Sequence, residues 1–355
     1  MRHVQHHAAQ LNLILRQTPD SVPRWVANLK NRKIWLLAAI LLALAAVVLA
    51  TRGPGEPSPN PPGTFSFAAL GDAPYYLWED LRYHLVLQDL DAHDLQWVLH
   101  VGDIFWRPCT DRLYRRSLDW FNGLRHPVIY TPGDNEWMDC WVAGSGGFAP
   151  QGRLARIRQI FFAQPERSLG GNPLPLVSQG GEFVENARWT HEGIVFATVH
   201  IIGSENGMGP FPARAPADDA AARRRTEAAA AWLRETFAEA TAANASAVVI
   251  GFHGDPAFED PVEDPFRQGF EPFLAALEEE AEQFRRPVLV IHGDQHEYIV
   301  DHPLKRRTTG RPLENLTRLE VPGSPDMGWV RVVVTPGAEN PFDFEPRVVP
   351  RWKYW

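Results

Sequence analysis

The sequence predicts an α/β layered domain over residues 64–355, and two observations support that class. Short apolar runs rich in β-branched residues alternate with segments whose apolar residues recur at the period of a helix. Polar loops that carry Asp or His follow several of these apolar runs directly. Strands that alternate with helices in this way form sheets whose faces the helices cover.

The predicted strands are short and bounded by Gly, Pro or polar residues. They cover residues 65–70, 97–101, 128–130, 194–201, 247–252 and 288–291, with further strands at 298–300, 317–321 and 329–334. The predicted helices cover residues 76–92, 111–124, 153–162, 221–242 and 272–284. The Ala-rich fourth helix carries Trp232, Leu233 and Phe237 on one side, so we expect it to cover a sheet face.

Residues 34–50 form an apolar run without charge, and three basic residues at 30–33 precede it. At about 1.5 Å per residue a helix over this run is roughly 25 Å long, slightly shorter than a hydrocarbon core of about 30 Å. The basic residues predict a cytoplasmic tail at 1–33, a transmembrane anchor at 34–50 and an extracytoplasmic domain, periplasmic or extracellular. A cleaved signal peptide and a buried core helix are the alternatives. Residues 51–63 predict a Pro-rich, extended linker.

Charge is divided unevenly along the chain. Residues 1–63 hold seven Lys and Arg against two Asp and Glu, which leaves 28 basic and 41 acidic residues for the rest. So acidic a domain is a poor electrostatic partner for the phosphate backbone of nucleic acids. We therefore expect no nucleic-acid partner.

Polar residues gather where the predicted strands end. They are Asp72, Asp103, Asp134, Asn135, His253, Asp294 and His296. Because ligands of open α/β sheets bind beyond the carboxyl ends of the strands, we expect these loops to converge. Crowded carboxylates repel one another unless cations neutralise them, and oxygen ligands mixed with imidazole suit Mn, Fe or Zn. A single Gly-Asp pair is ordinarily a turn, but the whole series in this order predicts a metal site.

The order of the motifs resembles the calcineurin-like metallophosphoesterase superfamily, which includes purple acid phosphatases and many phosphodiesterases. The shared pattern is Gly-Asp, Gly-Asp, Gly-(Asp/Asn)-x-Glu, His and a closing Gly-x-x-His, and the likeness covers residues 65–334. It implies a two-sheet β-sandwich flanked by helices. It also implies an enzyme, a phosphoric ester hydrolase that cleaves monoesters or diesters with two metal ions and a metal-activated hydroxide.

The resemblance also assigns roles to individual residues. Asp72 and His296 match ligands of the first metal ion, and Asp103 matches the carboxylate that bridges both ions. His253 matches a ligand of the second ion, and Asp134 stands where the family usually has an Asn ligand.

Three departures distinguish this chain from the family pattern. Pro74 stands where Asp-x-His would supply a histidine ligand, Asn135 replaces a histidine that assists the leaving group, and Asp294 replaces the first histidine of Gly-His-x-His. The site is therefore rich in carboxylates, which favours Mn, Fe or Mg over Zn. An amide cannot act as a general acid, but Asn135 can still donate a hydrogen bond to a phosphoryl oxygen.

Two further observations keep other interpretations open. Purple acid phosphatases place a metal-binding Tyr three residues after the bridging acid, and Trp106 holds that position here. The substitutions at Asn135 and Asp294 allow an alternative, a catalytically degenerate fold that binds metal or another ligand without turnover.

Several residues near the motifs are candidates for a substrate pocket, with structural packing as the alternative. They are His100, His200, His292, Asn186 and Trp137, together with the aromatic residues Tyr75, Tyr76, Trp78, Trp106 and Trp141.

The cysteines Cys109 and Cys140 lie six residues after Asp103 and Asp134 respectively. If the two acids meet at the metals, the loops behind them run side by side, and we expect a disulfide, which an extracytoplasmic location permits. Two free buried thiols are the alternative.

Overall fold

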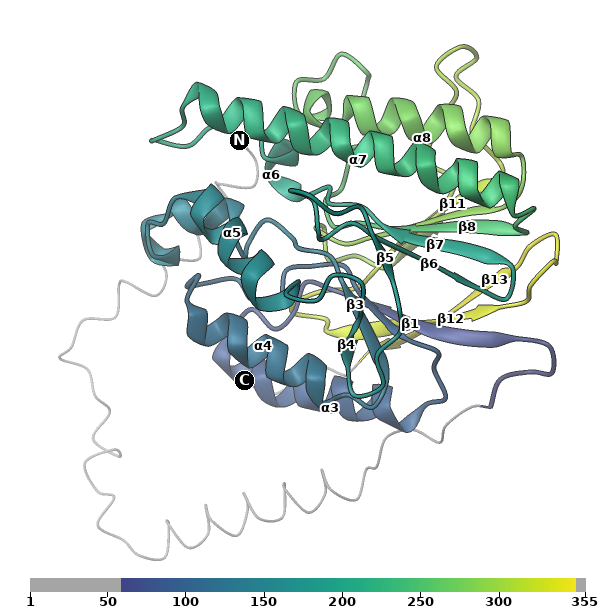
Figure 1. Ribbon diagram of the computed structural model, residues 1–355, viewed down its shortest axis with the longest axis horizontal. Helices are drawn as coiled ribbons and strands as arrows, with labels where there is room; N and C mark the ends of the chain where they lie inside the picture. The colour runs from purple at the N-terminus through teal and green to yellow at the C-terminus, as the bar shows by residue number, and fades with distance from the viewer. Residues whose placement is uncertain (1–58, 349–355) are drawn as a thin grey trace, which may run out of the picture. The chain divides into compact units, whose positions relative to one another are not determined.

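Two β-sheets lie face to face, and helices cover the outer face of each (Figure 1). The computed structural model describes residues 59–348, which belong to one unit, Glu56–Trp355. This arrangement agrees with the α/β class predicted from the sequence pattern and with the two-sheet sandwich implied by the family resemblance.

The first sheet contains six described strands, three of which run parallel at its centre. In spatial order the strands are β13 (Phe342–Val348), β12 (Gly328–Val334), β1 (Phe65–Leu70), β2 (Val98–His100), β3 (Pro127–Tyr130) and β4 (Leu169–Gly170). β12, β13 and β4 pair antiparallel with their neighbours.

The second sheet contains seven described strands around a parallel centre of β7, β8, β9 and β11. In spatial order the strands are β10 (Ile299–Asp301), β11 (Leu316–Glu320), β9 (Val288–His292), β8 (Ala247–Gly251), β7 (Ile194–Thr198), β6 (Ala187–His191) and β5 (Val177–Ser178).

The long helices fall into two sets, one for each sheet (Figure 1). Those on the first sheet are α3 (Asp80–Ala92), α4 (Asp111–Gly123) and α5 (Pro150–Phe161), and those on the second are α7 (Pro216–Ala242) and α8 (Glu271–Phe284). Shorter helical segments are η2 (Leu77–Glu79), η3 (Met138–Trp141), η4 (Ala143–Ser145), α6 (Gly203–Asn206) and η5 (Arg267–Gly269).

β1 shows how the sequence produces these layers. Its alternate residues Phe65, Phe67 and Ala69 pack between the sheets, whereas Ala68 and Leu70 face the helices. Every residue of the strand is buried, as expected for a strand covered on both faces. Burial of a side chain as large as Phe stabilises the fold by about 1.5–3 kcal/mol.

All nine predicted strands and all five predicted helices are present, with shifted ends and four additional strands. The predicted strand 194–201 ends earlier, at Thr198, and the predicted helix 76–92 is divided into η2 and α3. β4 and β5 have two residues each, too few to show an alternating pattern. β13 lies at a sheet edge and contains Pro346, which lowers its strand propensity.

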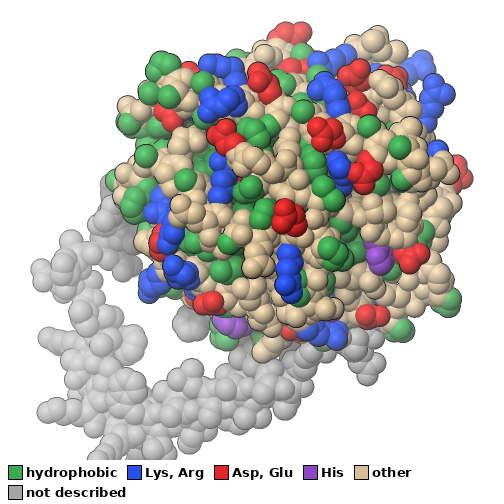
Figure 2. Space-filling view, in the orientation of Figure 1, with side chains coloured by type: hydrophobic (Ala, Val, Ile, Leu, Met, Phe, Trp, Pro, Cys, Tyr) green, Lys and Arg blue, Asp and Glu red, His purple; other side chains and the backbone are tan. Residues whose placement is uncertain are grey.

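No helix within residues 59–348 is long and apolar enough to cross a membrane. The predicted tail and anchor, and most of the predicted linker, lie outside the described residues and stay predictions. On the face of the folded unit shown in Figure 2, acidic and basic side chains are interspersed.

Candidate metal centre

The carboxyl ends of parallel strands from both sheets meet at one place. Asp72, Asp103 and Asp134 follow β1, β2 and β3 of the first sheet. His253 and Asp294 follow β8 and β9 of the second sheet. The loops that the sequence predicts to converge therefore do so, although they come from different sheets.

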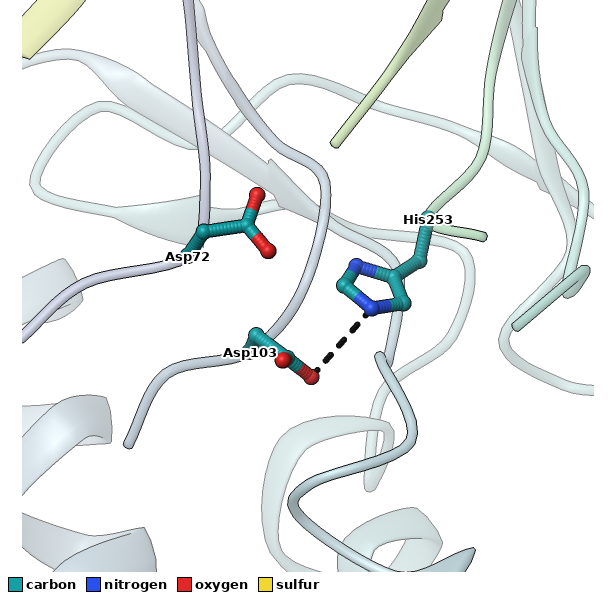
Figure 3. A group of neighbouring side chains, drawn as sticks. All are labelled: Asp72, Asp103 and His253. Carbon is teal, nitrogen blue, oxygen red and sulfur yellow. Dashed lines mark ion pairs between the residues drawn. The ribbon is translucent and has the colours of Figure 1, made fainter. Parts of the chain in front are cut away.

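His253 lies at the centre of this cluster. Its Nε2 is 3.3 Å from Oδ1 of Asp103, 3.3 Å from Oδ1 of Asp134 and 3.7 Å from Oδ1 of Asp294. Two groups of three side chains each bring their ligand atoms within 4.8 Å of one another. One is Asp72, Asp103 and His253, shown in Figure 3, and the other is Asp134, His253 and Asp294.

Backbone carbonyls orient the two imidazoles of the cluster. Nδ1 of His253 lies 2.9 Å from the carbonyl oxygen of Val101, and Nδ1 of His296 lies 2.6 Å from that of Ser324. A carbonyl only accepts hydrogen bonds, so each Nδ1 carries a hydrogen and each Nε2 faces the cluster. Nε2 of His296 faces Oδ1 of Asp72 at 3.7 Å. This orientation of histidine by a second partner is typical of metal ligands.

Burial and mutual repulsion disfavour the charged forms of several carboxyls here. Burial raises the pKa of Asp103 well above its usual value despite the adjacent His253, and the neighbouring carboxylates raise it further. Burial and the charge of Asp134 raise the pKa of Asp294 to about 8. Burial also raises the pKa of Asp72, whose Oδ2 has no hydrogen-bond partner among residues 59–348. A cation would relieve this repulsion and pair with the unpartnered oxygen, so the donor set fits metal ions.

The backbone around the cluster is held in an uncommon conformation. Asp72, Asp103, Asp294 and His296 have positive φ angles of 55°, 55°, 81° and 66°. Such residues are strained unless the surroundings enforce the conformation, and they concentrate at functional sites. We therefore attribute a functional role to the backbone geometry that aims these four side chains.

At two glycines near the cluster, carboxylate oxygens occupy the space that a side chain would need. A Cβ at Gly133 would lie 2.1 Å from Oδ1 of Asp103, and one at Gly293 would lie 2.0 Å from Oδ2 of Asp72. Neither approach is possible for a side chain, which explains why glycine precedes Asp134 and Asp294.

The loop after β3 holds Asp103 directly. The backbone N–H of Asn135 donates to Oδ1 of Asp103 at 3.1 Å, and its side-chain amide donates to Oδ2 at 2.5 Å. The buried Glu136 accepts hydrogen bonds from the N–H of Gly133 and the hydroxyl of Tyr130. Asn135 thus lies at the site, and Glu136 fixes the turn that places it there.

Ser204, Asp139 and Tyr75 also lie at the site, although the sequence did not assign them to the metal centre. The Ser204 hydroxyl contacts Oδ2 of Asp134 at 2.7 Å and Oδ1 of Asp139 at 3.0 Å. The Tyr75 hydroxyl contacts Oδ2 of Asp103 at 2.6 Å. Of the three, only Tyr75 carried a sequence signal, as an aromatic residue shortly after the first acidic motif.

The histidines predicted as possible pocket residues are fully buried and contact other groups. His100 packs against Phe121, and His292 stacks on Phe252. Burial lowers the pKa of both to about 3, so both are neutral in the folded protein at ordinary pH. These contacts favour the structural role that we held open for both residues.

A buried polar group lies around the third predicted histidine, His200. Its Nδ1 lies 2.7 Å from Oε1 of Glu185. Arg158 donates one hydrogen bond to each oxygen of the same carboxylate. The side-chain oxygen of Asn186 accepts from the N–H of His200 at 2.7 Å, and Trp137 packs against the His200 ring. Asn186 and Trp137 thus support His200, and the backbone N–H of Trp137 donates to the carbonyl of Asp134 at 3.2 Å.

The predicted disulfide between Cys109 and Cys140 is confirmed, with the two Cα atoms 5.7 Å apart. Both cysteines are buried, and they lie six residues after Asp103 and Asp134 respectively. The bond ties those two loops together, as the spacing of the cysteines predicted.

Comparison with known proteins finds similar folds at low sequence identity. No protein-family model matches the chain, and no curated protein sequence matches it. The solved structure of PhoD matches with a TM-score of 0.50 and 14% identity over 82% of this chain and 69% of that chain. The crystal structure of TT1561 of Thermus thermophilus matches with a TM-score of 0.42 and 12% identity over 80% of this chain and 99% of that chain. The chain therefore has the fold of PhoD, in agreement with the two-sheet sandwich implied by its resemblance to calcineurin-like metallophosphoesterases.

Proposed function

We propose that this chain is a metal-dependent hydrolase of phosphate monoesters or diesters with a dinuclear metal centre. The observation that carries the proposal is the pair of overlapping groups, Asp72–Asp103–His253 and Asp134–His253–Asp294. His253 can bind only one ion through Nε2, but the carboxylate of Asp103 can offer one oxygen to each of two ions, so the two groups together hold enough ligands for two ions close together.

We assign the first ion to Asp72, Asp103 and His296, and the second to Asp103, Asp134, His253 and Asp294. When bound, the ions would activate water and neutralise charge on the phosphoryl group. Because carboxylates outnumber imidazoles in this set, we propose Mn, Fe or Mg rather than Zn as the resident metals.

The protein's own contribution is positioning and hydrogen bonding. Asn135 holds both oxygens of Asp103 through its backbone and side-chain N–H groups. A side-chain amide has two N–H donors, and we propose that the second donates to a phosphoryl oxygen as negative charge develops there. His253 and His296 are kept in one tautomer by Val101 and Ser324, so their Nε2 atoms need no reorganisation.

The test is turnover of several phosphate ester classes by metal-depleted protein to which single metals are returned. We expect hydrolysis with at least one of Mn, Fe or Mg, and its loss in Asp103→Asn together with reduced metal content. Asp343→Asn, an exposed acid on β13, is the matched control and should leave both unchanged. Full metal occupancy without turnover of any ester class would contradict the proposal and favour the degenerate binding fold.

We further propose that the domain works outside the cytoplasm, anchored by residues 34–50. The disulfide supports this location, because such bonds persist mainly in oxidising compartments. Protease added to intact spheroplasts should digest the domain, whereas a protected domain would contradict the proposed orientation.

A further inference from the structure

The segment after β7 places a hydroxyl beside a carboxylate assigned to the second metal ion. The Ser204 hydroxyl lies 2.7 Å from Oδ2 of Asp134, whereas Oδ1 of the same carboxylate lies 3.3 Å from Nε2 of His253. We propose that Ser204 is a positioning residue for the second ion, because its hydroxyl holds one oxygen of Asp134 and thereby presents the other to the metal. This inference rests on the dinuclear centre proposed above and adds a residue that controls one of its ligands.

The carboxylate at position 134 creates the need for such a partner. The family usually has an Asn ligand here, and an amide offers a single oxygen. The ionised carboxylate of Asp134 has two oxygens, and both only accept hydrogen bonds. A cation can bind a carboxylate through one oxygen or through both. Because the hydroxyl of Ser204 donates to Oδ2, Oδ1 is the oxygen that remains for the second ion.

Gly203 brings the backbone of this segment against two ligands of the second ion. A Cβ at this position would lie 2.6 Å from Oδ2 of Asp134 and 2.7 Å from Oδ1 of Asp294. No side chain fits at these distances. Glycine therefore lets the chain pass close enough to the centre for the next residue, Ser204, to reach Asp134.

Ser204 begins a run of left-handed backbone. The φ angles are 53° at Ser204, 55° at Glu205 and 52° at Asn206, and Gly207 continues the run at 73°. Residues other than glycine enter this conformation singly rather than in runs, because their Cβ crowds the following carbonyl oxygen. Such backbone persists only where the surroundings enforce it, and it concentrates at functional sites.

Asn206 is the residue through which the surroundings enforce this run. It is fully buried, and its Oδ1 accepts hydrogen bonds from the N–H of Ile202 at 3.3 Å and from the guanidinium of Arg225 at 3.0 Å. Its amide donates to the hydroxyl of Thr226 at 2.9 Å and to the carbonyl of Gly269 at 3.0 Å. None of these four partners is assigned to a metal ion. The run is therefore fixed by the protein itself, and Ser204 is in place before an ion binds.

Asp139 competes for the same hydroxyl. Its Oδ1 lies 3.0 Å from Oγ of Ser204, and a hydroxyl has only one hydrogen to donate. The contact with Asp134 is the shorter of the two, at 2.7 Å. If the hydroxyl served Asp139 instead, its removal would leave the binding of metal by Asp134 unchanged, and this difference can be measured.

The experiment titrates the metal-depleted full chain with Mn²⁺ and follows free Mn²⁺ by electron paramagnetic resonance. We expect two binding steps in the unmutated protein. Ser204→Ala should weaken one step about 10- to 100-fold, as is typical when the partner of a metal ligand is lost. His253→Asn should weaken the same step, because it removes a ligand assigned to the second ion. The matched control is Ser178→Ala, which removes a hydroxyl on the edge strand β5 and should leave both steps unchanged.

Ser204→Gly separates positioning from a change in stability. Glycine adopts positive φ angles readily, so this variant should be at least as stable as Ser204→Ala although it lacks the same hydroxyl. Equal weakening of the Mn²⁺ step in both variants assigns the effect to the hydroxyl. Weakening that instead follows the free energy of unfolding in urea would overturn the inference.

The outcomes also separate this inference from the proposed function. Two unchanged binding steps in Ser204→Ala would overturn the role of Ser204 and leave the metal centre standing. In the Asp134→Asn background Ser204→Ala should weaken the step less, since the charged acceptor is gone, and an equal loss would show that the hydroxyl does not act through Asp134. Failure of the unmutated protein to bind Mn, Fe or Mg would overturn both the inference and the proposed function.

Discussion

Nε2 of His253 lies 3.3 Å from Oδ1 of Asp103, and this contact joins the two sheets at their carboxyl ends. His253 follows β8 of the second sheet, whereas Asp103 follows β2 of the first. Neither sheet carries both groups, so the centre exists only because the sheets pack together through the apolar layer between them. Removal of the imidazole should therefore affect metal binding more than folding.

We expect His253→Asn to bind less metal and to lose its activity while it stays folded, because the imidazole assigned to the second ion is gone. Metal content per chain, measured after dialysis, gives the direct readout. The exposed His302→Asn is the control and should bind as much metal as the unmutated protein. Unchanged metal content in His253→Asn would remove His253 from the ligand set.

The second prediction concerns Asp294, where the family pattern has a histidine. Asp294→His should move metal preference toward Zn, because imidazole is a softer donor than carboxylate. The measurement is competition between Zn and Mn for the depleted protein, with Asp343→Asn as a control for the loss of one negative charge. An unchanged ratio of bound Zn to Mn would indicate that Asp294 does not contact the metal.

The third prediction concerns the disulfide, which closes a loop with a sequence separation of 31 residues. In the chain-entropy account, a loop of this length stabilises the fold by about 3–4 kcal/mol. Cys109→Ala/Cys140→Ala should lower the free energy of unfolding in urea by a similar amount, less any gain from relaxed packing. A difference below about 1 kcal/mol would show that the bond positions the loops without stabilising the fold.

The fourth prediction concerns acid stability and the buried pair Glu185–His200. Burial lowers the pKa of His200 to about 4 although Glu185 opposes the shift. Burial alone would raise the pKa of Glu185, but His200 and Arg158 lower it to about 2. In the unfolded chain the pKa is about 6.5 for His200 and about 4.3 for Glu185, so both side chains bind protons more tightly there than in the folded protein. Both therefore make the fold more stable at neutral pH than at acidic pH.

That stability should decline as pH falls, from about 6.5 through 4 for His200 and from about 4.3 through 2 for Glu185. His200→Asn should reduce the slope of unfolding free energy between pH 6.5 and 4 by up to about 1.4 kcal/mol per pH unit. The proteins should be compared without metal, so that metal release at low pH does not contribute. The exposed His84→Asn should keep the slope of the unmutated protein, and an equal slope in His200→Asn would contradict the prediction.

The parts of the site that the sequence predicted are those with a local signature. Asp72, Asp103 and Asp134 each follow a short buried strand, and glycine precedes each acid. A strand followed by Gly-Asp can be recognised within ten residues, and the convergence of the loops follows from sheet geometry. The two cysteines were predictable for the same reason, because each has a fixed offset from one of these acids.

The parts that the sequence did not predict depend on contacts between distant segments. Ser204 and Asp134 are 70 residues apart, and nothing beside Ser204 marks it as a partner of a carboxylate. Tyr75 contacts Asp103 and His296, but its neighbours suggested only an aromatic wall. β4 and β5 have two residues each, which is too few to show the alternating apolar pattern of a strand. They form because the longer strands β3 and β6 offer them pairing partners.

The last prediction concerns Asn135, which holds the position of a histidine that assists the leaving group in the family. A positioned general acid contributes roughly 10²- to 10⁴-fold to the rate, and an amide cannot supply the proton. The side chain of Asn135 instead donates to Oδ2 of Asp103 at 2.5 Å, which places it at the centre without an acidic proton. The rate should therefore depend steeply on leaving-group pKa, with activated aryl esters cleaved far faster than alkyl esters.

Asn135→His should flatten that dependence, because an imidazolium at this position can protonate the departing oxygen. The measurement is a plot of log kcat/KM against leaving-group pKa for both proteins, with metal content confirmed equal so that a lost ion cannot imitate the effect. The slope, rather than the rate, separates proton donation from a general disturbance of the site, since weaker metal binding would lower the rates for all esters together. A flat plot for the unmutated protein would show that another acid already serves the leaving group and that the amide at position 135 is no handicap.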